Sequence, residues 1–168
     1  MINLPVLFFG YLIILFSIIG FGYLSSKLLP NRLSLGELGL NGILFMTILS
    51  YITNLFVPHN FIHNSIFLII GLFAFFLISK KKLFKKKIKL ILLVSSVLFI
   101  GIIMFKNHDD FFYYHFPYII SLIEFKKIFG LGNLEHGFRT PSSIFYFNSL
   151  FYLPILGKSL INSGAIYF

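Results

Sequence analysis

The chain contains no cysteine among its 168 residues. Disulfide bonds, thiolate nucleophiles and cysteine-ligated metals are therefore excluded. Charge is also scarce, because only 11% of the residues are charged, against roughly 25% in soluble domains. Hydrophobic residues make up 58% of the chain, and a water-soluble fold of this size cannot bury that much apolar surface. The composition predicts an integral membrane protein.

Acidic residues are few as well, and the formal net charge is +9. Seven of the fourteen cationic residues lie within residues 80–89, between two apolar runs. A basic block beside a membrane span is typical of a topology signal. We therefore expect no nucleic-acid partner. A second interpretation of the block, a site for anionic lipid, remains open.

Four apolar runs are long enough to cross a bilayer, for which a helix needs about 20 residues. They cover residues 4–24, 38–57, 61–78 and 88–105. The first run is too long for the core of a signal peptide, and no cleavage pattern follows it, so we expect it to be retained. The sequence predicts an all-α, polytopic membrane protein with about four transmembrane helices, an interfacial helix and a partial fifth segment.

The loops between these runs predict an orientation. The loop at 25–37 carries Lys27 and Arg32, the loop at 58–60 carries no Lys or Arg, and the loop at 79–87 carries six lysines. Cytoplasmic loops are rich in Lys and Arg. The first and third loops are therefore predicted to be cytoplasmic. The N-terminus and everything from residue 106 onward are predicted to lie outside.

The composition changes after the fourth run, so we divide the chain into a transmembrane region, 1–106, and an extracytoplasmic region, 107–168. Four of the five acidic residues follow residue 106, and Asp109 and Asp110 are adjacent. Carboxylates at a membrane boundary are candidates for function by default. The alternative is that the pair caps a helix N-terminus and marks the membrane boundary.

Three further segments follow the acidic pair. Residues 118–129 have the pattern of an amphipathic helix in the interface plane, with Pro117 suited to its first turn and Gly130 to its end. The glycine-rich stretch 130–137 matches neither the Walker nor the Rossmann spacing. Ser142 or Ser143 is expected to cap a helix whose apolar body is 144–156. That helix is tilted or re-entrant, or continues as a span past Pro154.

Three motifs in this region resemble one family. Residues 110–115 read Asp-Phe-Phe-Tyr-Tyr-His, residues 130–134 read Gly-Leu-Gly-Asn-Leu, and a Ser-Ser pair at 142–143 precedes an aromatic segment. This order is similar to that of bacterial multi-span proteins of the GT-C glycosyltransferase type. The resemblance covers roughly residues 109–152. It implies that the chain is the N-terminal part of such an enzyme, in the bacterial cytoplasmic membrane.

The resemblance also implies a reaction. GT-C enzymes transfer a sugar from a polyprenyl-phosphate carrier, here the expected lipid-linked donor, to an acceptor on the outer face of the membrane. Asp110, with Asp109 beside it, occupies the position of the acid that serves as general base on the acceptor hydroxyl or helps to hold a metal. A positioned carboxylate suits the first role, because an acceptor hydroxyl is a poor nucleophile until a base removes its proton.

Four more residues are substrate-binding candidates: His115, Arg139, Glu135 and His136. Arg139 suits the carrier phosphate, because arginine pairs bidentately with phosphate. His115 is either a donor to the leaving phosphate or a hydrogen-bonded interfacial histidine. It shares a face with Asp110 only if a helix begins between them. Glu135 and His136 are adjacent, but two residues without further ligands make no convincing metal site. The use of a divalent metal is left open.

Two alternatives belong to other functional classes. The first is a small, non-catalytic subunit that binds a partner membrane chain through its helices, with a purely structural acidic pair. The second is a fragment of a transporter. It would be favoured if Asn41, Asn54 or Lys89 lined a water path, because polar groups inside a membrane mark such paths.

Overall fold

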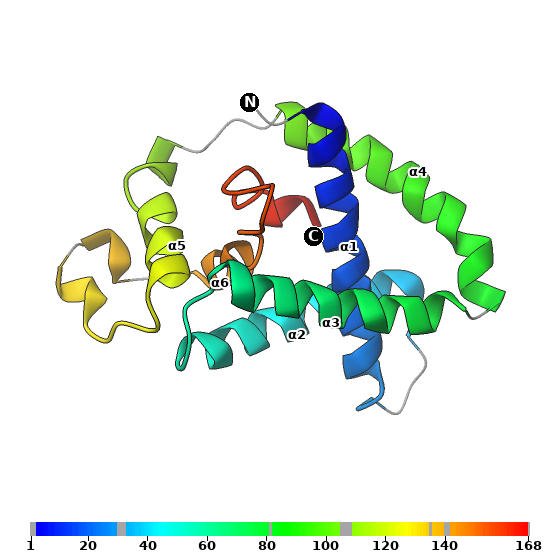
Figure 1. Cartoon of the computed structure of the whole chain (residues 1–168), viewed down its shortest axis with the longest axis horizontal. Coiled ribbons are helices and arrows are strands. Elements are labelled where there is room, and N and C mark those ends of the chain that lie inside the picture. The colour runs from blue at the N-terminus through cyan, green and yellow to red at the C-terminus, as the bar shows by residue number, and fades with distance from the viewer. Residues whose placement is uncertain are drawn as a thin grey trace.

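The computed structural model describes residues 3–29, 33–80, 82–104, 109–134, 136–139 and 142–167, and this part of the chain is helical without a β-strand. The all-α prediction is confirmed. Four long helices come first, followed by two short helices and four 3₁₀ turns (Figure 1). They are α1 (Leu4–Ser26), α2 (Leu35–Asn54), α3 (Phe61–Ser79), α4 (Lys82–Met104), η1 (Asp109–Phe111), α5 (His115–Glu124), η2 (Leu131–Asn133), η3 (His136–Phe138), α6 (Ser143–Ser149) and η4 (Gly164–Tyr167).

The four long helices are long and apolar enough to cross a membrane. Their boundaries differ from the prediction by three residues or more at both ends of α2 and at the start of α4. α2 begins three residues early because Ser34 and Glu37 form a capping box, in which each side chain accepts a hydrogen bond from the other residue's backbone N–H. The predicted third loop is mostly the first turns of α4, because lysine is a good helix former and does not break the helix. Arg32 of the first loop lies outside the described residues.

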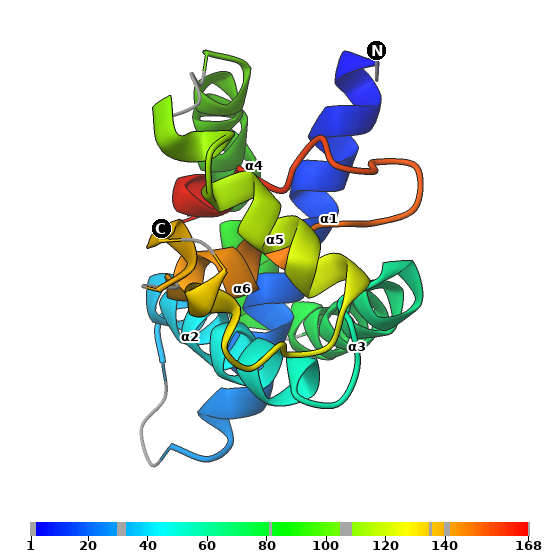
Figure 2. The same cartoon turned by 90° about the vertical axis from the view of Figure 1, so that its left-hand side faces the viewer.

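α1 crosses the hairpin of α2 and α3 (Figures 1 and 2). The crossing is tight because glycines stand where the backbones meet. A Cβ on Gly20 would overlap the carbonyl oxygen of Gly71 in α3, and one on Gly22 would overlap the carbonyl oxygen of Leu38 in α2. Small residues of this kind let apolar helices approach closely where no hydrophobic effect drives them together.

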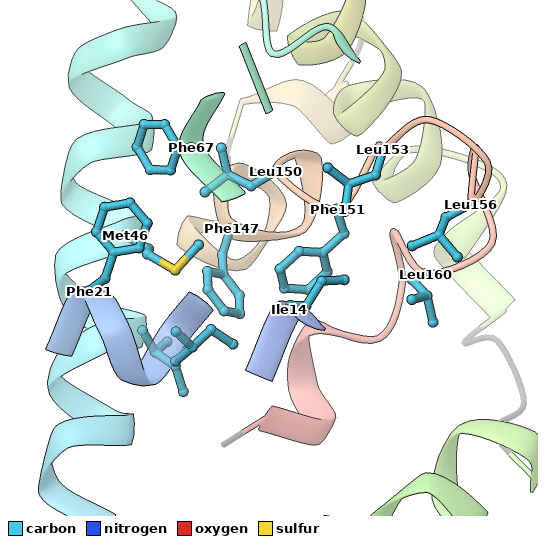
Figure 3. Packing of buried hydrophobic residues seen from close by; sticks show 12 residues of the cluster. Ile14, Phe21, Met46, Phe67, Phe147, Leu150, Phe151, Leu153, Leu156 and Leu160 are labelled. Atoms are coloured by element: carbon cyan, nitrogen blue, oxygen red, sulfur yellow. The ribbon is translucent and has the colours of Figure 1, made fainter. Parts of the chain in front are cut away.

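The segment after α5 is buried against the middle of the long helices. Phe147 and Phe151 are almost fully buried, in one cluster with Ile14 and Ile18 of α1 and Met46 of α2. Figure 3 shows these aromatic side chains beside Ile14 and Met46. Regions 1–106 and 107–168 thus share a hydrophobic core.

The predicted helix body at 144–156 is wrong in length, because α6 ends at Ser149. Ser142 stands at its N-cap position, although its side chain accepts no capping hydrogen bond. The chain then turns sharply after Pro154: Ile155 and Gly157 have positive φ angles, and Leu153 pairs with Gly157. A straight span therefore does not continue past Pro154.

α5 is also displaced from its predicted bounds of 118–129. It begins at His115, with Pro117 in its first turn as predicted, and it ends at Glu124. It stops there because α2 takes over the hydrogen bonds: the Asn54 side chain donates to the Phe125 carbonyl at 3.3 Å, and the Lys127 N–H donates to the Asn54 carbonyl at 2.7 Å. Gly130 does not end α5 but opens η2, in the left-handed conformation with φ 81°.

A network of buried polar side chains joins α6 to the α2–α3 hairpin. The Asn64 amide nitrogen donates to the carbonyls of His59, Ser149 and Tyr152, at 2.8, 2.8 and 2.9 Å. The His59 ring lies between Ser149 Oγ at 2.6 Å and the Ser50 carbonyl at 3.1 Å. That carbonyl can only accept, so the proton on His59 Nε2 faces it, while Ser149 Oγ, which donates to the Tyr146 carbonyl at 2.7 Å, lies beside Nδ1. Burial, and then the neighbouring His63, lower the pKa of His59 to about 3, which keeps the ring neutral.

The glycine crossing gives a first prediction. Gly20→Ala places a methyl group on a backbone carbonyl of α3, which cannot move aside as a flexible side chain would. The expected loss of stability is about 1–3 kcal/mol, as for other overpacked sites. The melting temperature of the detergent-purified protein measures it.

Gly101→Ala in α4 is the matched control, because a Cβ there meets nothing within 4 Å. Its stability should stay the same or rise, since alanine is the better helix former. Equal losses in both variants would show that the close crossing does not exist.

The polar network gives a second prediction. Asn64→Asp replaces the amide donor by a carboxylate that faces three carbonyl oxygens. Since buried acceptors that lose their donor each cost about 1–3 kcal/mol, we expect α6 to detach. Limited trypsin digestion should then cleave within residues 109–167 faster than in the wild type.

Asn60→Asp controls for the added charge. Asn60 Oδ1 accepts hydrogen bonds from the N–H groups of Ile62 and His63 at the start of α3. Asp caps a helix as well as Asn does, so digestion should match the wild type. Unchanged digestion of Asn64→Asp would contradict the docking role of the network.

Candidate functional site

The acidic pair forms the 3₁₀ turn η1, just before α5. Asp109 is exposed and Asp110 is half-buried. The backbone folds back on Asp110, whose carbonyl accepts from the N–H groups of Tyr113 and Tyr114, both at 3.2 Å. The Tyr114 hydroxyl donates to Asp110 Oδ2 at 3.5 Å. One carboxylate is thus held by its neighbours, while the other faces solvent.

His115 is the first residue of α5, so a helix does begin between it and Asp110. Its half-buried ring packs against aromatic rings. The ring centroid lies 4.4 Å from that of Tyr114 and 4.9 Å from that of Phe145 in α6. α6 therefore fixes the position of this histidine.

Arg139 and His136 lie in or next to η3, and both are exposed. Arg139 Nε donates to the carbonyl of Gly132 in η2 at 3.3 Å, which ties the two turns together. Of the other substrate-binding candidates, Glu135 lies outside the described residues. The Arg139 guanidinium therefore stands at the surface, where it can meet an anion.

Tyr114 joins the two halves of this site. Its hydroxyl contacts Asp110, and its Cβ lies only 2.6 Å from where a Cβ on Gly137 would be. A side chain at position 137 would therefore push η3 away from Tyr114. In the sequence Tyr114 stands out only as part of a motif, and this role was not predicted. The sequence carried a signal for this role, because Tyr114 follows Asp110 by four residues and Gly137 lies between the candidates His136 and Arg139.

A second polar cluster, which the sequence analysis did not identify, lies between α2, α5 and α6. It consists of Lys127, Tyr118 and Tyr146, and we call it the Lys127 cluster. Lys127 Nζ lies 2.5 Å from the Tyr146 hydroxyl and 3.3 Å from the Tyr118 hydroxyl. The Tyr146 ring stacks on Tyr51 of α2, with centroids 3.8 Å apart. Burial raises the pKa of Tyr118 to about 12, so its phenol keeps its proton at neutral pH.

The Lys127 cluster adjoins the acidic site. The Tyr118 ring lies edge-on to Phe138 of η3, with centroids 5.6 Å apart, and also contacts Phe145, which packs on His115. The acidic site and the Lys127 cluster therefore pack against the same group of aromatic rings.

The structure also locates the residues that would mark a metal site or a water path. Among the residues that the structure describes, no three His, Cys, Asp or Glu side chains gather as a metal site. Asn41 donates to Ser25 Oγ at 2.5 Å, Asn54 donates to two carbonyls, and Lys89 is exposed. A cavity beside Ser17 and Asn64 measures about 10 Å³, room for one water molecule and not for a sugar.

Comparison with known proteins gives one match. The model of a family described as "Domain of unknown function (DUF8201)" matches residues 5–168. No curated protein and no solved structure matches. Because the match covers almost the whole chain, this protein belongs to the DUF8201 family.

Proposed function

We propose that this chain is the N-terminal part of a GT-C-like glycosyltransferase that moves a sugar from a polyprenyl-phosphate carrier to an acceptor. The observation that carries the proposal is the half-buried Asp110 carboxylate, held by the Tyr114 hydroxyl beside the turn that bears Arg139. A held carboxylate suits a general base, and a surface guanidinium suits the donor phosphate.

The proposal places the four long helices in the bacterial cytoplasmic membrane, with the site on its outer face. The fold is compatible with this orientation. In Figure 1 the α2–α3 connection and α5 lie on the left of the molecule, while the α3–α4 corner, where the lysine run begins, lies on the right. Cationic residues favour the cytoplasmic side, so the acidic site would face outward.

A second candidate function is that of a subunit that binds another membrane chain. α4 favours it, because only 17% of its span is buried, against 50% of the span of α1. An apolar face so poorly covered packs against either lipid or the helices of a partner. The subunit function needs no carboxylate chemistry, and the Asp110 experiment separates the two.

The test is Asp110→Asn in the protein as its gene encodes it, assayed in membrane vesicles with a panel of radiolabelled polyprenyl-phosphate sugars. Loss of a general base lowers the rate by about 10²–10⁴-fold, and we expect a loss of this size with normal membrane insertion. Asp109→Asn is the matched control, because Asp109 is the exposed neighbour.

Two results would contradict the proposal. If Asp110→Asn transfers sugar at the wild-type rate, Asp110 is not the general base. Absence of transfer by the wild-type protein with every sugar in the panel would favour the subunit function.

A further inference from the structure

Lys127 carries a positive charge in an unusual place. Its side chain is half-buried, and its two hydrogen-bonding partners, Tyr118 and Tyr146, are only 2% and 1% exposed. Among the described residues no carboxylate lies within ion-pair distance of it. A cation removed from water without a counter-charge is costly, and an anion that binds there relieves that cost.

The donors of the Lys127 cluster exceed its acceptors. The ammonium has three N–H groups, and the two phenol oxygens accept two of them. The two phenol oxygens are 3.4 Å apart, so one hydroxyl can donate to the other. One N–H and one O–H then remain without an acceptor among the described residues. This arrangement fits an oxyanion with several oxygens better than it fits a neutral ligand.

The cluster is tied to the end of a candidate membrane helix. Lys127 N–H bonds to the carbonyl of Asn54, the last residue of α2, and Tyr51 of the same final turn stacks on Tyr146. Tyr51 is 38% exposed, so it forms an open edge of the cluster. Tyrosine favours the boundary between bilayer and water, which is where the phosphate groups of lipids lie.

We propose that Lys127, Tyr118 and Tyr146 bind the phosphate group of a membrane lipid at the Asn54 end of α2. The ammonium supplies the positive charge that attracts the phosphate, the phenols orient the ammonium, and Tyr51 borders the acyl chains of the lipid. This binding requires no sugar and no catalysis, so it stands whether or not Asp110 is a general base.

The test is native mass spectrometry of the detergent-purified full chain with phosphatidylglycerol, with phosphatidylcholine or with inorganic phosphate. The wild type should bind phosphatidylglycerol, and Lys127→Met, which keeps the apolar stem, should bind it about tenfold less tightly, as for the loss of one charge-assisted hydrogen bond. Lys126→Met is the matched control, because Lys126 is the exposed neighbour and has the same charge. It should bind like the wild type.

The other outcomes of this experiment also support or overturn the proposal. If inorganic phosphate competes with the lipid in the wild type and not in Lys127→Met, the phosphate group is the recognised part and the lipid chain is dispensable. Equal lipid binding by Lys127→Met and Lys126→Met would overturn the proposal. If Lys127→Met fails to fold, as judged by its melting temperature in phosphatidylcholine, Tyr118→Phe replaces it. That variant keeps the ring and should bind phosphatidylglycerol severalfold less tightly, and unchanged binding would overturn the proposal.

Discussion

The side-chain amide of Asn64 is the contact on which the rest of the structure depends. It is buried in α3 and donates to three carbonyls, two of which, those of Ser149 and Tyr152, belong to the end of α6 and the turn that follows. An unpaired carbonyl in an apolar surrounding is costly, so these bonds fix where the end of α6 lies. Once α6 is fixed, Phe147 and Phe151 fill the space beside α1 and α2.

Both candidate sites follow from that docking. Phe145 of α6 supports the rings of His115 and Tyr118, and Tyr146 of α6 completes the Lys127 cluster. Asn54 performs the corresponding task from α2, because its side chain and its carbonyl both bond to the segment that ends α5. The Asp110 carboxylate and the Lys127 ammonium thus lie just before and just after α5 in the chain, and Phe145 contacts both His115 and Tyr118.

The sequence predicted the parts of the fold that depend on local pattern. Long apolar runs predict long helices whatever their neighbours are, and all four appear. The predictions at 118–129 and 144–156 were wrong in extent, because Asn54 and Asn64 end those helices with hydrogen bonds from distant parts of the chain. Asp110 and His115 were recognisable from a motif. Lys127 was not, since its partner Tyr146 lies nineteen residues away and no spacing rule joins them.

The central proposal is that α5, with the Asp110 site and the Lys127 cluster, lies on the outer side of the membrane, at the Asn54 end of α2 and away from the lysine run. The absence of cysteine makes it directly measurable. Single cysteines at Ser142, which is exposed before α6, and at Ser79, the last residue of α3, can be labelled with a membrane-impermeant maleimide. In intact cells Ser142→Cys should react, and Ser79→Cys should react only after the membrane is opened. The reverse pattern would contradict the account.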